Sequence, residues 1–401
     1  MPNLAANNPA RPGRHHAWKM VTVADLADLK ITYGTLDENL PDHQGIVRAG
    51  DIRDGRITTS QPGRIGAAGP KDTRAALQEG DLVVVLVRRV GDAALVTEQH
   101  KGWIATRAVG IVRSQDPDIT HWLRIWFRTP AGQGWINQQV SAHVEPTLSL
   151  DALRKMRVAF PPPEQIRAIH ELVTLIARKV ELNHQIVATA IALADAHYAT
   201  WTRQRESWTP TTFGKVTHAR TGKSVPPAFP DDGGVDVARV SPADIFKASL
   251  PYIDQTVRRE CVDPGVVCEP GTILVAPRPG EARTAVALEP TAPCRGMLAV
   301  RPVDATDLWW LLHELRSRSI QLPEAAQGSH AREITRRAFS RLHVAWPGPD
   351  VRRQFFRVAK PLHDRARAAL AENRSLNVLL DMLLRDISSA SGSFFGRTDP
   401  V

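Results

Sequence analysis

The stretch ARTGKSVPP, residues 219–227, carries a glycine, a lysine and a serine in the order found in phosphate-binding loops. Such a loop also needs a glycine five positions before the second one, so that its backbone amides can surround the phosphates, and a helix must follow. Thr217 stands at the position of that first glycine, and prolines follow where the helix should start. We therefore expect no nucleotide site here.

Other catalytic constellations are also missing from the sequence. There is no methyltransferase tetrapeptide such as NPPY, no paired carboxylates suited to nuclease chemistry, and no metal-ligand spacing among the 14 histidines. The three cysteines, Cys261, Cys268 and Cys294, are odd in number and lack CxxC pairing, which argues against disulfides and a zinc site. We expect a chain without a catalytic or metal site, located in a reducing cytoplasm.

Side chains that can recognise DNA are plentiful by contrast. Arginine donates two hydrogen bonds to guanine, and asparagine and glutamine pair with adenine in a similar two-pronged way. Arg88 and Arg89 end a strand-like segment, from which they could reach phosphate or guanine. Further donors, each of which could equally be an ordinary solvated side chain, are Arg107, Gln133, Asn137, Gln138, Gln139 and His143 in the first half of the chain, and Arg278, Arg295, His330, Arg332 and Arg336 in the second.

The charge balance points to a polyanionic partner. The chain has 401 residues, with 51 lysines and arginines against 42 aspartates and glutamates, which gives a net charge of +9. Such an excess favours either nucleic acid or an anionic membrane surface. No apolar run is long enough to span a membrane, and the basic N-terminus lacks the apolar segment of a secretory signal. We therefore favour nucleic acid and expect no membrane association.

An internal repeat organises the chain. Trp18 opens the segment WKMVTVADLADLKITYG, and 190 residues later Trp208 opens WTPTTFGKVTHARTG. At nearly the same offset, EGDLVVVLVRR (79–89) and EPGTILVAPRP (269–279) each predict a turn followed by a buried, β-branched strand. Two further pairs of segments align in the same order. RAGDIRDGRI aligns with VSPADIFKASL through a shared aspartate–isoleucine step. EPTLSLDALRKMRVAFPPP aligns with AREITRRAFSRLHVAWPGP, and in both a short helix leads into a strand that ends at proline. Because the residues between these landmarks diverge, we infer one scaffold with two different surfaces.

A long helix is expected after each repeat. The first starts at Pro163, whose fixed φ suits an initial helical position, and Glu164 places a negative charge near the positive end of the helix dipole. Its apolar stripe is Ile169, Val173, Ile176, Val180, Val187, Ala190, Ala194 and Trp201. The stripe of the second helix is Phe355, Val358, Leu362, Ala366, Ala369, Leu376, Leu380, Leu383 and Ile387. Asn183 and Asn373 interrupt the two stripes, where they either set the register of a helix pair or face solvent at its margin.

The length of these stripes predicts the architecture. Each runs for about 40 residues, or about 60 Å at ~1.5 Å per residue, and a helix that long with one narrow seam needs a partner helix. The first helix leaves one globular region and ends at the next, so the second must return beside it. We predict an α+β protein: two similar strand-rich regions separated by a pair of long antiparallel helices, a coiled coil with pseudo-two-fold symmetry. The expected divisions are a disordered tail 1–17, globular regions 18–160 and 206–346, helices 161–205 and 347–390, and a C-terminal tail 391–401.

These segments carry a family resemblance. LSLDALRKMRVAFPPPEQIRAIHELVTLIARKVELNHQIVATAIALADAHYATW resembles the conserved helical region of the DNA specificity subunit of type I restriction-modification systems, whose members share the proline, glutamate, glutamine helix start and a stretch like KVELN (179–183). TGKSVPPAFPDDGGVDVARVSPADI and QGSHAREITRRAFSRLHVAWP resemble landmarks of that family's target recognition domains. The second helix departs from the pattern, because WPGPDVRRQ lacks the glutamate–glutamine pair.

The resemblance implies a function. Each globular half would be a target recognition domain that reads one part of an asymmetric, bipartite target in double-stranded DNA, with the helices as spacer. The implied partners are modification subunits, two of them, which form a methyltransferase, and restriction subunits, which supply the motor and nuclease. The chain itself would be non-catalytic and without a cofactor, while S-adenosylmethionine and ATP would bind to the partners. In the family a glycine-rich turn follows the first strand of the domain, which would place Gly222, Lys223 and Ser224 near DNA.

A different class of function is compatible with the same sequence pattern. The chain could be a non-catalytic coiled-coil scaffold whose strand-rich regions bind proteins rather than DNA, its basic charge being incidental. Binding of protein partners that survives nuclease treatment, together with no DNA mobility shift at low salt, would favour the scaffold.

Overall fold

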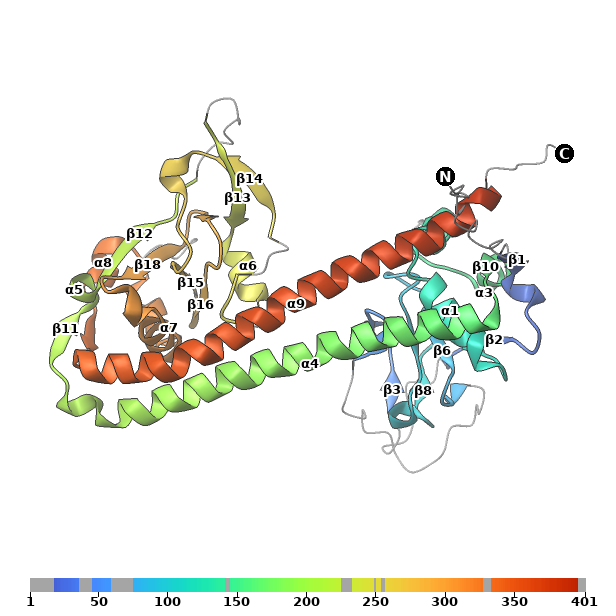
Figure 1. Ribbon diagram of the computed structural model, residues 1–401, viewed down its shortest axis with the longest axis horizontal. Helices are drawn as coiled ribbons and strands as arrows, with labels where there is room; N and C mark the ends of the chain where they lie inside the picture. Colours follow the sequence, from blue (N-terminus) through green and yellow to red (C-terminus); the bar gives the residue numbers. More distant parts are fainter. Residues whose placement is uncertain are drawn as a thin grey trace, which may run out of the picture. The chain divides into compact units, whose positions relative to one another are not determined.

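The computed structural model describes residues 18–35, 45–58, 75–140, 145–224, 233–248, 250–253, 257–326 and 333–395, with side chains up to residue 390. The chain divides into two compact units. Unit 1 comprises Met1–Val180 and Arg374–Val401, and unit 2 comprises Glu181–Asn373. The long helices α4 (Pro163–Trp201) and α9 (Pro349–Phe395) contribute to both units (Figure 1). The expected tail 1–17 lies outside the described residues, and α9 continues to Phe395, five residues beyond its expected end.

Unit 1 is built around a four-stranded antiparallel sheet, in the order β2 (Lys30–Tyr33), β9 (Val109–Arg113), β6 (Leu82–Val85) and β7 (Ala93–Leu95). Three strand pairs surround it: antiparallel β1 (Lys19–Thr22) with β10 (Arg157–Phe160), parallel β3 (Ile46–Val47) with β8 (Ile104–Ala105), and antiparallel β4 (Ile52–Arg53) with β5 (Arg56–Ile57). Its own helices are α1 (Pro117–Trp126), α2 (Pro130–Gln139) and α3 (Leu150–Lys155).

Unit 2 contains a four-stranded antiparallel sheet in the order β12 (Thr217–Thr221), β18 (Leu298–Pro302), β15 (Ile273–Arg278) and β16 (Glu281–Val286). Beside it lie antiparallel β11 (Pro210–Thr212) with β19 (His343–Ala345), and a three-stranded sheet of β14 (Arg259–Val262), β13 (Val235–Val240) and β17 (Thr291–Pro293). Its helices are α5 (Phe213–Val216), α6 (Pro242–Lys247), α7 (Leu308–Ser317) and α8 (Arg336–Arg341).

The two units repeat one topology, which confirms the predicted α+β fold. The buried strands predicted from EGDLVVVLVRR (79–89) and EPGTILVAPRP (269–279) are β6 and β15. Each is the third strand in the order of its sheet. A parallel strand pair accompanies both sheets, β3–β8 in unit 1 and β13–β17 in unit 2. A short helix, α3 or α8, precedes the strand that pairs with the first strand of its unit. A Ser149 or Thr335 hydroxyl caps that helix by accepting a hydrogen bond from the amide three residues later.

Landmark residues of the repeat have the same partners in each unit. Trp18 packs edge-on against Trp122 of α1, with ring centroids 5.4 Å apart, and Trp208 packs against Trp310 of α7 at 5.5 Å. In the aspartate–isoleucine step, the Asp51 carboxylate accepts a hydrogen bond from the amide three residues earlier at 2.8 Å, as does Asp244 at the same distance. The aligned sequence landmarks are therefore structural equivalents.

Each central strand divides two cores. In β6, Leu82 and Val84 face the core that contains α1, α3, α4 and α9, while Val83 and Val85 face a second core toward β3 and β8. The same alternation occurs in β15, where Ile273 and Val275 share a core with the long helices and the intervening residues face away. Both faces of these strands are buried, which explains the apolar runs LVVV in β6 and ILVA in β15.

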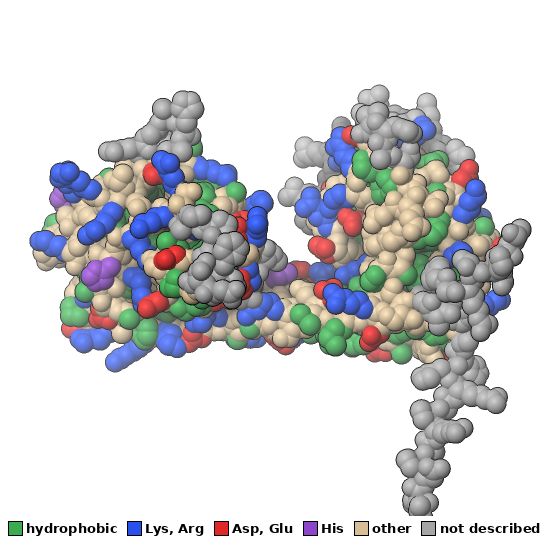
Figure 2. Space-filling view, turned by 90° about the horizontal axis from the view of Figure 1, so that it is seen from above, with side chains coloured by type: hydrophobic (Ala, Val, Ile, Leu, Met, Phe, Trp, Pro, Cys, Tyr) green, Lys and Arg blue, Asp and Glu red, His purple; other side chains and the backbone are tan. Residues whose placement is uncertain are grey.

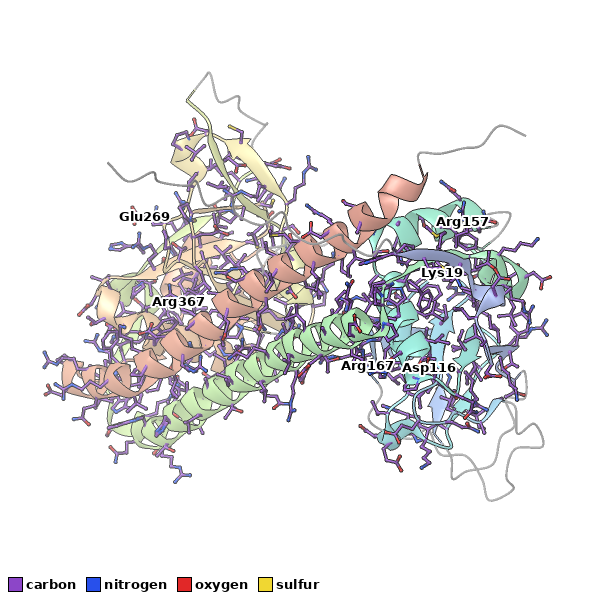
Figure 3. The ribbon with its side chains drawn as sticks, turned by 45° about the vertical axis from the view of Figure 1, so that its right-hand side comes forward. Lys19, Asp116, Arg157, Arg167, Glu269 and Arg367 are labelled. Atoms are coloured by element: carbon purple, nitrogen blue, oxygen red, sulfur yellow. The ribbon has the colours of Figure 1, made fainter. Side chains whose placement is uncertain are left out.

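The helix α1 attaches the sheet of unit 1 to α4. The rings of His121 on α1 and His170 on α4 stack 3.7 Å apart. One turn away, Arg167 on α4 donates to Asp118 at 2.9 Å, close to Asp116, which caps α1 (Figure 3). α1 therefore lies along the first turns of the long helix.

Candidate nucleic-acid interface and helix seam

The turn between β6 and β7 carries the first pair of predicted DNA-binding residues. Arg88 adopts a left-handed backbone conformation, with φ of 67°, and its exposed guanidinium pairs with Glu145 at 2.9 Å. Arg89 donates to the carbonyl oxygens of Ala49 and Ile52, at 3.0 and 2.8 Å, so its guanidinium is held over the β4–β5 hairpin. Arg88 is thus the freer of the two, because a surface ion pair contributes little.

The helix α2 lies against this turn. A Cβ at Gly91, in the same turn, would come within 3.3 Å of the Gln133 amide nitrogen and would collide with Ile136. Gln133 itself donates to the Phe127 carbonyl at 2.6 Å, which directs its amide toward the protein. Asn137, one turn further along α2, is exposed. The structure therefore brings Arg88, Arg89, Gln133 and Asn137 into one neighbourhood of unit 1.

The remaining candidates of unit 1 are more scattered. Arg107 is exposed and its guanidinium lies 5.8 Å from the ring centroid of Tyr33, on the edge strand β2. A cation over an exposed aromatic ring is a suitable contact for a nucleotide base. Gln138 and Gln139 are exposed at the end of α2, and His143 lies outside the described residues.

In unit 2 the equivalent hairpin turn carries Arg278. This exposed residue ends β15, and its guanidinium lies 3.8 Å from the ring centroid of Phe246 on α6. Arg283, on β16, donates to the Phe246 carbonyl at 3.0 Å. In both units an arginine at the hairpin turn therefore contacts the segment that contains the aspartate–isoleucine landmark. Arg89 makes this contact in unit 1, and Arg278 makes it in unit 2 through Phe246.

The glycine-rich turn forms a second group in unit 2. A Cβ at Gly222 would collide with the Cys294 carbonyl, so only glycine allows this approach. Lys223 and Ser224 are exposed beyond it, and the Lys223 carbonyl accepts from Arg239 at 2.9 Å. Arg295, next to Cys294, pairs with Glu333 at 2.8 Å. Arg336 is exposed at the start of α8, whereas His330 and Arg332 lie outside the described residues.

The seam of the helix pair is apolar in unit 1. Val173 and Ile176 on α4 share one core with Leu380, Leu384 and Ile387 on α9. The other predicted seam residues of this unit, Ile169, Leu376 and Leu383, are half-buried against that core, and Val180 is half-buried. Leu384, which is 6 % exposed, was not predicted; the sequence stripe placed its neighbour Leu383 there.

In unit 2 the seam contains a buried amide pair. Asn183 donates to the Asn373 side-chain oxygen at 2.8 Å and to a Glu372 carboxylate oxygen at 3.0 Å. Both asparagines are buried, which excludes the alternative that they face solvent. Val187 continues the seam as a core residue and Leu362 packs at its edge. A buried polar pair in a helix seam is a recognised device for fixing register.

A second polar group of unit 2 was missed by the sequence argument. A chain of hydrogen bonds joins Tyr252, His363 on α9, His313 on α7 and Asp195 on α4; we call these four residues the polar chain. The Tyr252 hydroxyl lies 2.6 Å from His363 Nδ1, the two Nε2 atoms are 3.1 Å apart, and His313 Nδ1 lies 2.6 Å from Asp195. The Trp309 ring stacks on His363 at 3.8 Å.

The polar chain has one consistent arrangement of protons. The ionised carboxylate of Asp195 only accepts, so His313 Nδ1 carries a proton and its Nε2 accepts from His363; the Tyr252 hydroxyl then donates to His363 Nδ1. Burial would raise the pKa of Asp195, but hydrogen bonds from His313 and Arg316 outweigh it and lower that pKa to about 2. Burial, followed by the effect of His313, lowers the pKa of His363 to about 3. Both imidazoles are therefore neutral.

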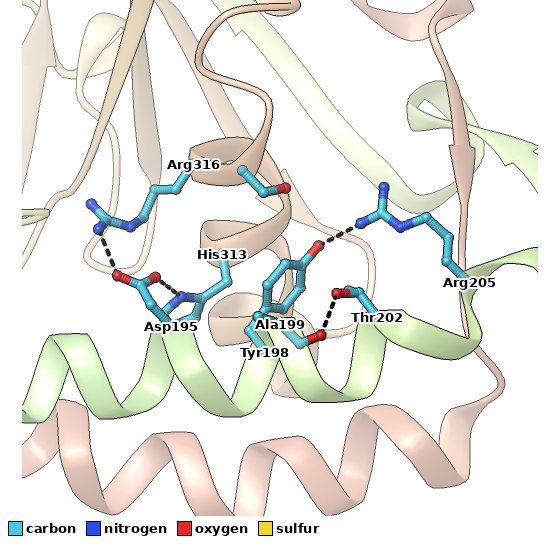
Figure 4. Close-up of a pocket in the computed structure, with 8 residues that line it drawn as sticks. Asp195, Tyr198, Ala199, Thr202, Arg205, His313 and Arg316 are labelled. Atoms are coloured by element: carbon cyan, nitrogen blue, oxygen red, sulfur yellow. Dashed lines mark hydrogen bonds and ion pairs between the residues drawn. The ribbon is translucent and has the colours of Figure 1, made fainter.

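A hollow of about 500 Å³ opens between α4 and α7 at the end of this chain (Figure 4). Asp195 and Tyr198 on α4 face His313 and Arg316 on α7. Beneath it the buried Glu314 carboxylate binds Tyr198, Arg205 at 2.6 Å and Arg318 at 2.6 Å. All the charges have partners within the unit, so these groups hold α7 onto α4 and leave no free charge for a ligand.

Two further classes of site are not found in the described part of the chain. No cluster of three or more histidine, cysteine, aspartate or glutamate side chains in it could hold a metal ion. None of its helices combines the length and apolar character needed to span a bilayer.

Comparisons with known proteins identify relatives. No family model matches the chain. The specificity subunit of the type I restriction enzyme EcoBI of Escherichia coli is 26% identical over 154 residues, which are 38% of this chain and 31% of that protein. The chain therefore matches about a third of the length of this relative. A crystal structure of the S subunit of a type I restriction-modification system from M. genitalium matches with a TM-score of 0.62 at 13% identity, over 94% of this chain and 98% of that one.

The resemblance to type I specificity subunits is confirmed. At 13% identity, the likeness to the M. genitalium subunit concerns the fold, and it extends over nearly the whole of both chains. The HsdS subunit from Thermoanaerobacter tengcongensis also matches, with 18% identity over 94% of this chain and 96% of that one, but its TM-score of 0.32 is too low to support a conclusion.

Proposed function

We propose that the chain is a DNA-binding specificity subunit that recognises a bipartite, asymmetric target. The observation that carries this proposal is the construction of one sheet topology twice, in units that both include parts of the same two helices. Equivalent hairpin turns present different side chains, the exposed pair Arg88 and Arg89 in unit 1 and Arg278 followed by proline in unit 2. A duplicated scaffold with unlike surfaces suits two unlike half-sites.

The charge of the chain supports a nucleic-acid partner. Lysine and arginine side chains cover parts of both units on the face drawn in Figure 2, and the net charge is +9. Contacts from such side chains to phosphates give affinity and register, and base-edge contacts supply sequence preference. Half-sites about one turn of B-DNA apart, ~34 Å, can be read by two linked modules without contact to the bases between them.

We infer the rest of the assembly from the resemblance. The proposed partners are modification subunits, two of them, which would methylate the target, and restriction subunits, which would translocate and cleave DNA. S-adenosylmethionine and ATP would bind to those partners, and the chain itself would act without catalysis in the cytoplasm. The proposed domain limits are 18–160 and 206–346 for the recognition domains, with the spacer helices between and after them.

A binding selection tests the proposed function. Purified full-length chain, alone and with its modification subunits, would be incubated with a library of random duplexes, and the bound fraction sequenced. We expect enrichment of two short blocks separated by a constant number of unselected base pairs. Enrichment of a single contiguous block would refute the bipartite model. Absence of any DNA binding at low salt, with protein partners retained after nuclease treatment, would support the scaffold instead.

A further inference from the structure

Two arginines four residues apart, Arg124 on α1 and Arg128 just after the C-cap of that helix, face α4 and the β4–β5 hairpin of unit 1. Arg124 donates to the Thr174 hydroxyl of α4 at 3.3 Å. Arg128 lies beside the hairpin turn, where a Cβ at Gly55 would be 3.5 Å from its Nη1 atom. Both side chains are half-buried. None of the DNA-binding residues expected from the sequence belongs to this group, which we call the α1 arginine site.

The α1 arginine site gathers positive charge without direct neutralisation. In the described part of the chain, neither Arg124 nor Arg128 has a carboxylate oxygen within ion-pair distance. Arg56, from β5, adds a third guanidinium and donates to the Ala177 carbonyl of α4. Burial, then the charges of Arg128 and Arg56, lower the pKa of Arg124 to about 10, so it remains charged at neutral pH. The fold therefore holds three like charges close together.

Ordinary structural roles do not account for this arrangement. Arginines near the C-terminal end of a helix often donate hydrogen bonds to its last carbonyl oxygens. Here the Arg124 side chain donates to Thr174 on α4 instead, and the Arg128 side chain donates no bond to those carbonyl oxygens. No guanidinium nitrogen of Arg124 or Arg128 is both buried from solvent and without a hydrogen-bond partner. Their unused donors are accordingly accessible from outside.

We propose that the α1 arginine site binds one phosphodiester group of a nucleic-acid backbone, between Arg124 and Arg128. Guanidinium groups donate paired hydrogen bonds to phosphate oxygens, and an anion there removes the mutual repulsion. Burial lowers the pKa of Arg128, the charges of Asp54, Asp381 and Asp92 oppose that shift, and the charge of Arg56 adds to it. This inference rests on the proposed function and adds a sequence-independent contact to it.

Salt-dependent binding by the Arg128→Gln variant tests the proposal. Affinities of the full-length chain for a target duplex and for a scrambled duplex would be measured at several salt concentrations. Loss of one phosphate contact lowers the slope of log affinity against log salt by about 0.9, which is about 3.5-fold in relative affinity between ~50 and ~200 mM. We expect that change equally on both duplexes. Arg357→Gln, an exposed residue of α9 with the same loss of charge, should leave the slope unchanged.

Several outcomes would overturn the proposal. A slope for Arg128→Gln that equals the wild-type slope would do so, and Arg124→Gln repeats the test if the first variant melts at a lower temperature. The wild type and Arg128→Gln could also show equal slopes of log DNA affinity against log salt, while inorganic phosphate raises the melting temperature of the wild type alone. That result would show that the site binds a free ion and not the DNA backbone. A wild-type chain without affinity for DNA would instead refute the proposed function, so the two failures are distinguishable.

Discussion

Mild acid should destabilise unit 2 through the histidines of the polar chain. His363 and His313 are fully buried, with 0 and 1 % of their surfaces exposed. Burial and the neighbouring His313 lower the pKa of His363 to about 3, and burial lowers the pKa of His313 although Asp195 opposes the change. Of the charged groups nearby, Arg316 and Arg367 are positive and also lower the pKa of His363, while Asp364 is an anion that acts on Tyr252, which burial keeps neutral. An unfolded histidine titrates near ~6.5.

The sign and size of the effect follow from these pKa values. Below pH ~6.5 the unfolded chain binds a proton that folded His363 does not, so the free energy of unfolding decreases as the pH falls. For one proton the slope approaches about 1.4 kcal/mol per pH unit well below pH ~6.5, and the change from pH ~6.5 to ~4.5 removes about 2 kcal/mol. His313 acts in the same direction. A loss of this size is a large part of the ~5–15 kcal/mol that stabilises a typical domain.

Chemical denaturation between pH 4.5 and 7.5 measures this effect. Tryptophan fluorescence reports unfolding of unit 2, because Trp309 stacks directly on His363. His363→Gln removes the titrating group, so its plot of unfolding free energy against pH should be flatter than that of the wild type, by about 1.4 kcal/mol per pH unit. His184→Gln, at an exposed position of α4, is the matched control and should keep the wild-type slope. If His363→Gln also kept that slope, the argument from the polar chain would be refuted.

Three further predictions concern the long helices and the hairpin turn. Asn183→Ala should lower the free energy of unfolding by about 2 kcal/mol, roughly 1 for each hydrogen bond. A double-mutant cycle with Asn373→Ala should give a coupling energy of about 1 kcal/mol. Strictly additive effects of the two substitutions would contradict the hydrogen bond between the two amides. Arg88→Gly should leave the free energy of unfolding unchanged or raise it by up to about 1 kcal/mol, because glycine adopts positive φ freely. Its affinity for DNA should fall in a mobility-shift titration. A melting temperature of Arg88→Gly below that of the wild type would contradict the conformational argument. Pro361→Ala should raise the free energy of unfolding by about 1–3 kcal/mol in chemical denaturation, since it restores an amide donor at an exposed position of α9. No gain would mean that the helix already accommodates the proline.

The repeated landmarks of the sequence predicted the architecture well. Trp18 and Trp208, and the two aspartate–isoleucine steps, have equivalent partners because they depend on local hydrogen bonding and on burial within one unit. The three–four spacing of apolar residues likewise located the seam of α4 and α9 within one residue, with Leu384 in place of Leu383 as the core residue. Local patterns of this kind are readable because the period of the helix is fixed.

The polar residues of the core were not readable from the sequence in the same way. His363 lies on α9, and it is buried against Tyr252 and His313, which lie 111 and 50 residues away along the chain. The single sequence does not connect such distant partners. Asn183 was recognised as part of the seam, but only its bond to Asn373 decides between a buried pair and a solvent-facing margin.

The α1 arginine site illustrates a related difficulty. In the sequence WLRIWFR, Arg124 and Arg128 look like the solvated face of an amphipathic helix. Their half-burial results from α4 and the β4–β5 hairpin, which cover that face. Charge alone would not have singled them out among the 51 lysines and arginines of the chain.

Methylome sequencing of the host strain, before and after deletion of the gene for this chain alone, tests the central claim most directly. We expect that one methylated motif disappears, and that it consists of two short, unlike blocks separated by a constant number of unspecified base pairs. Restoring the gene should restore the motif. Loss of a contiguous motif, or an unchanged methylome in a strain that retains active modification subunits, would contradict recognition of a split target by this chain.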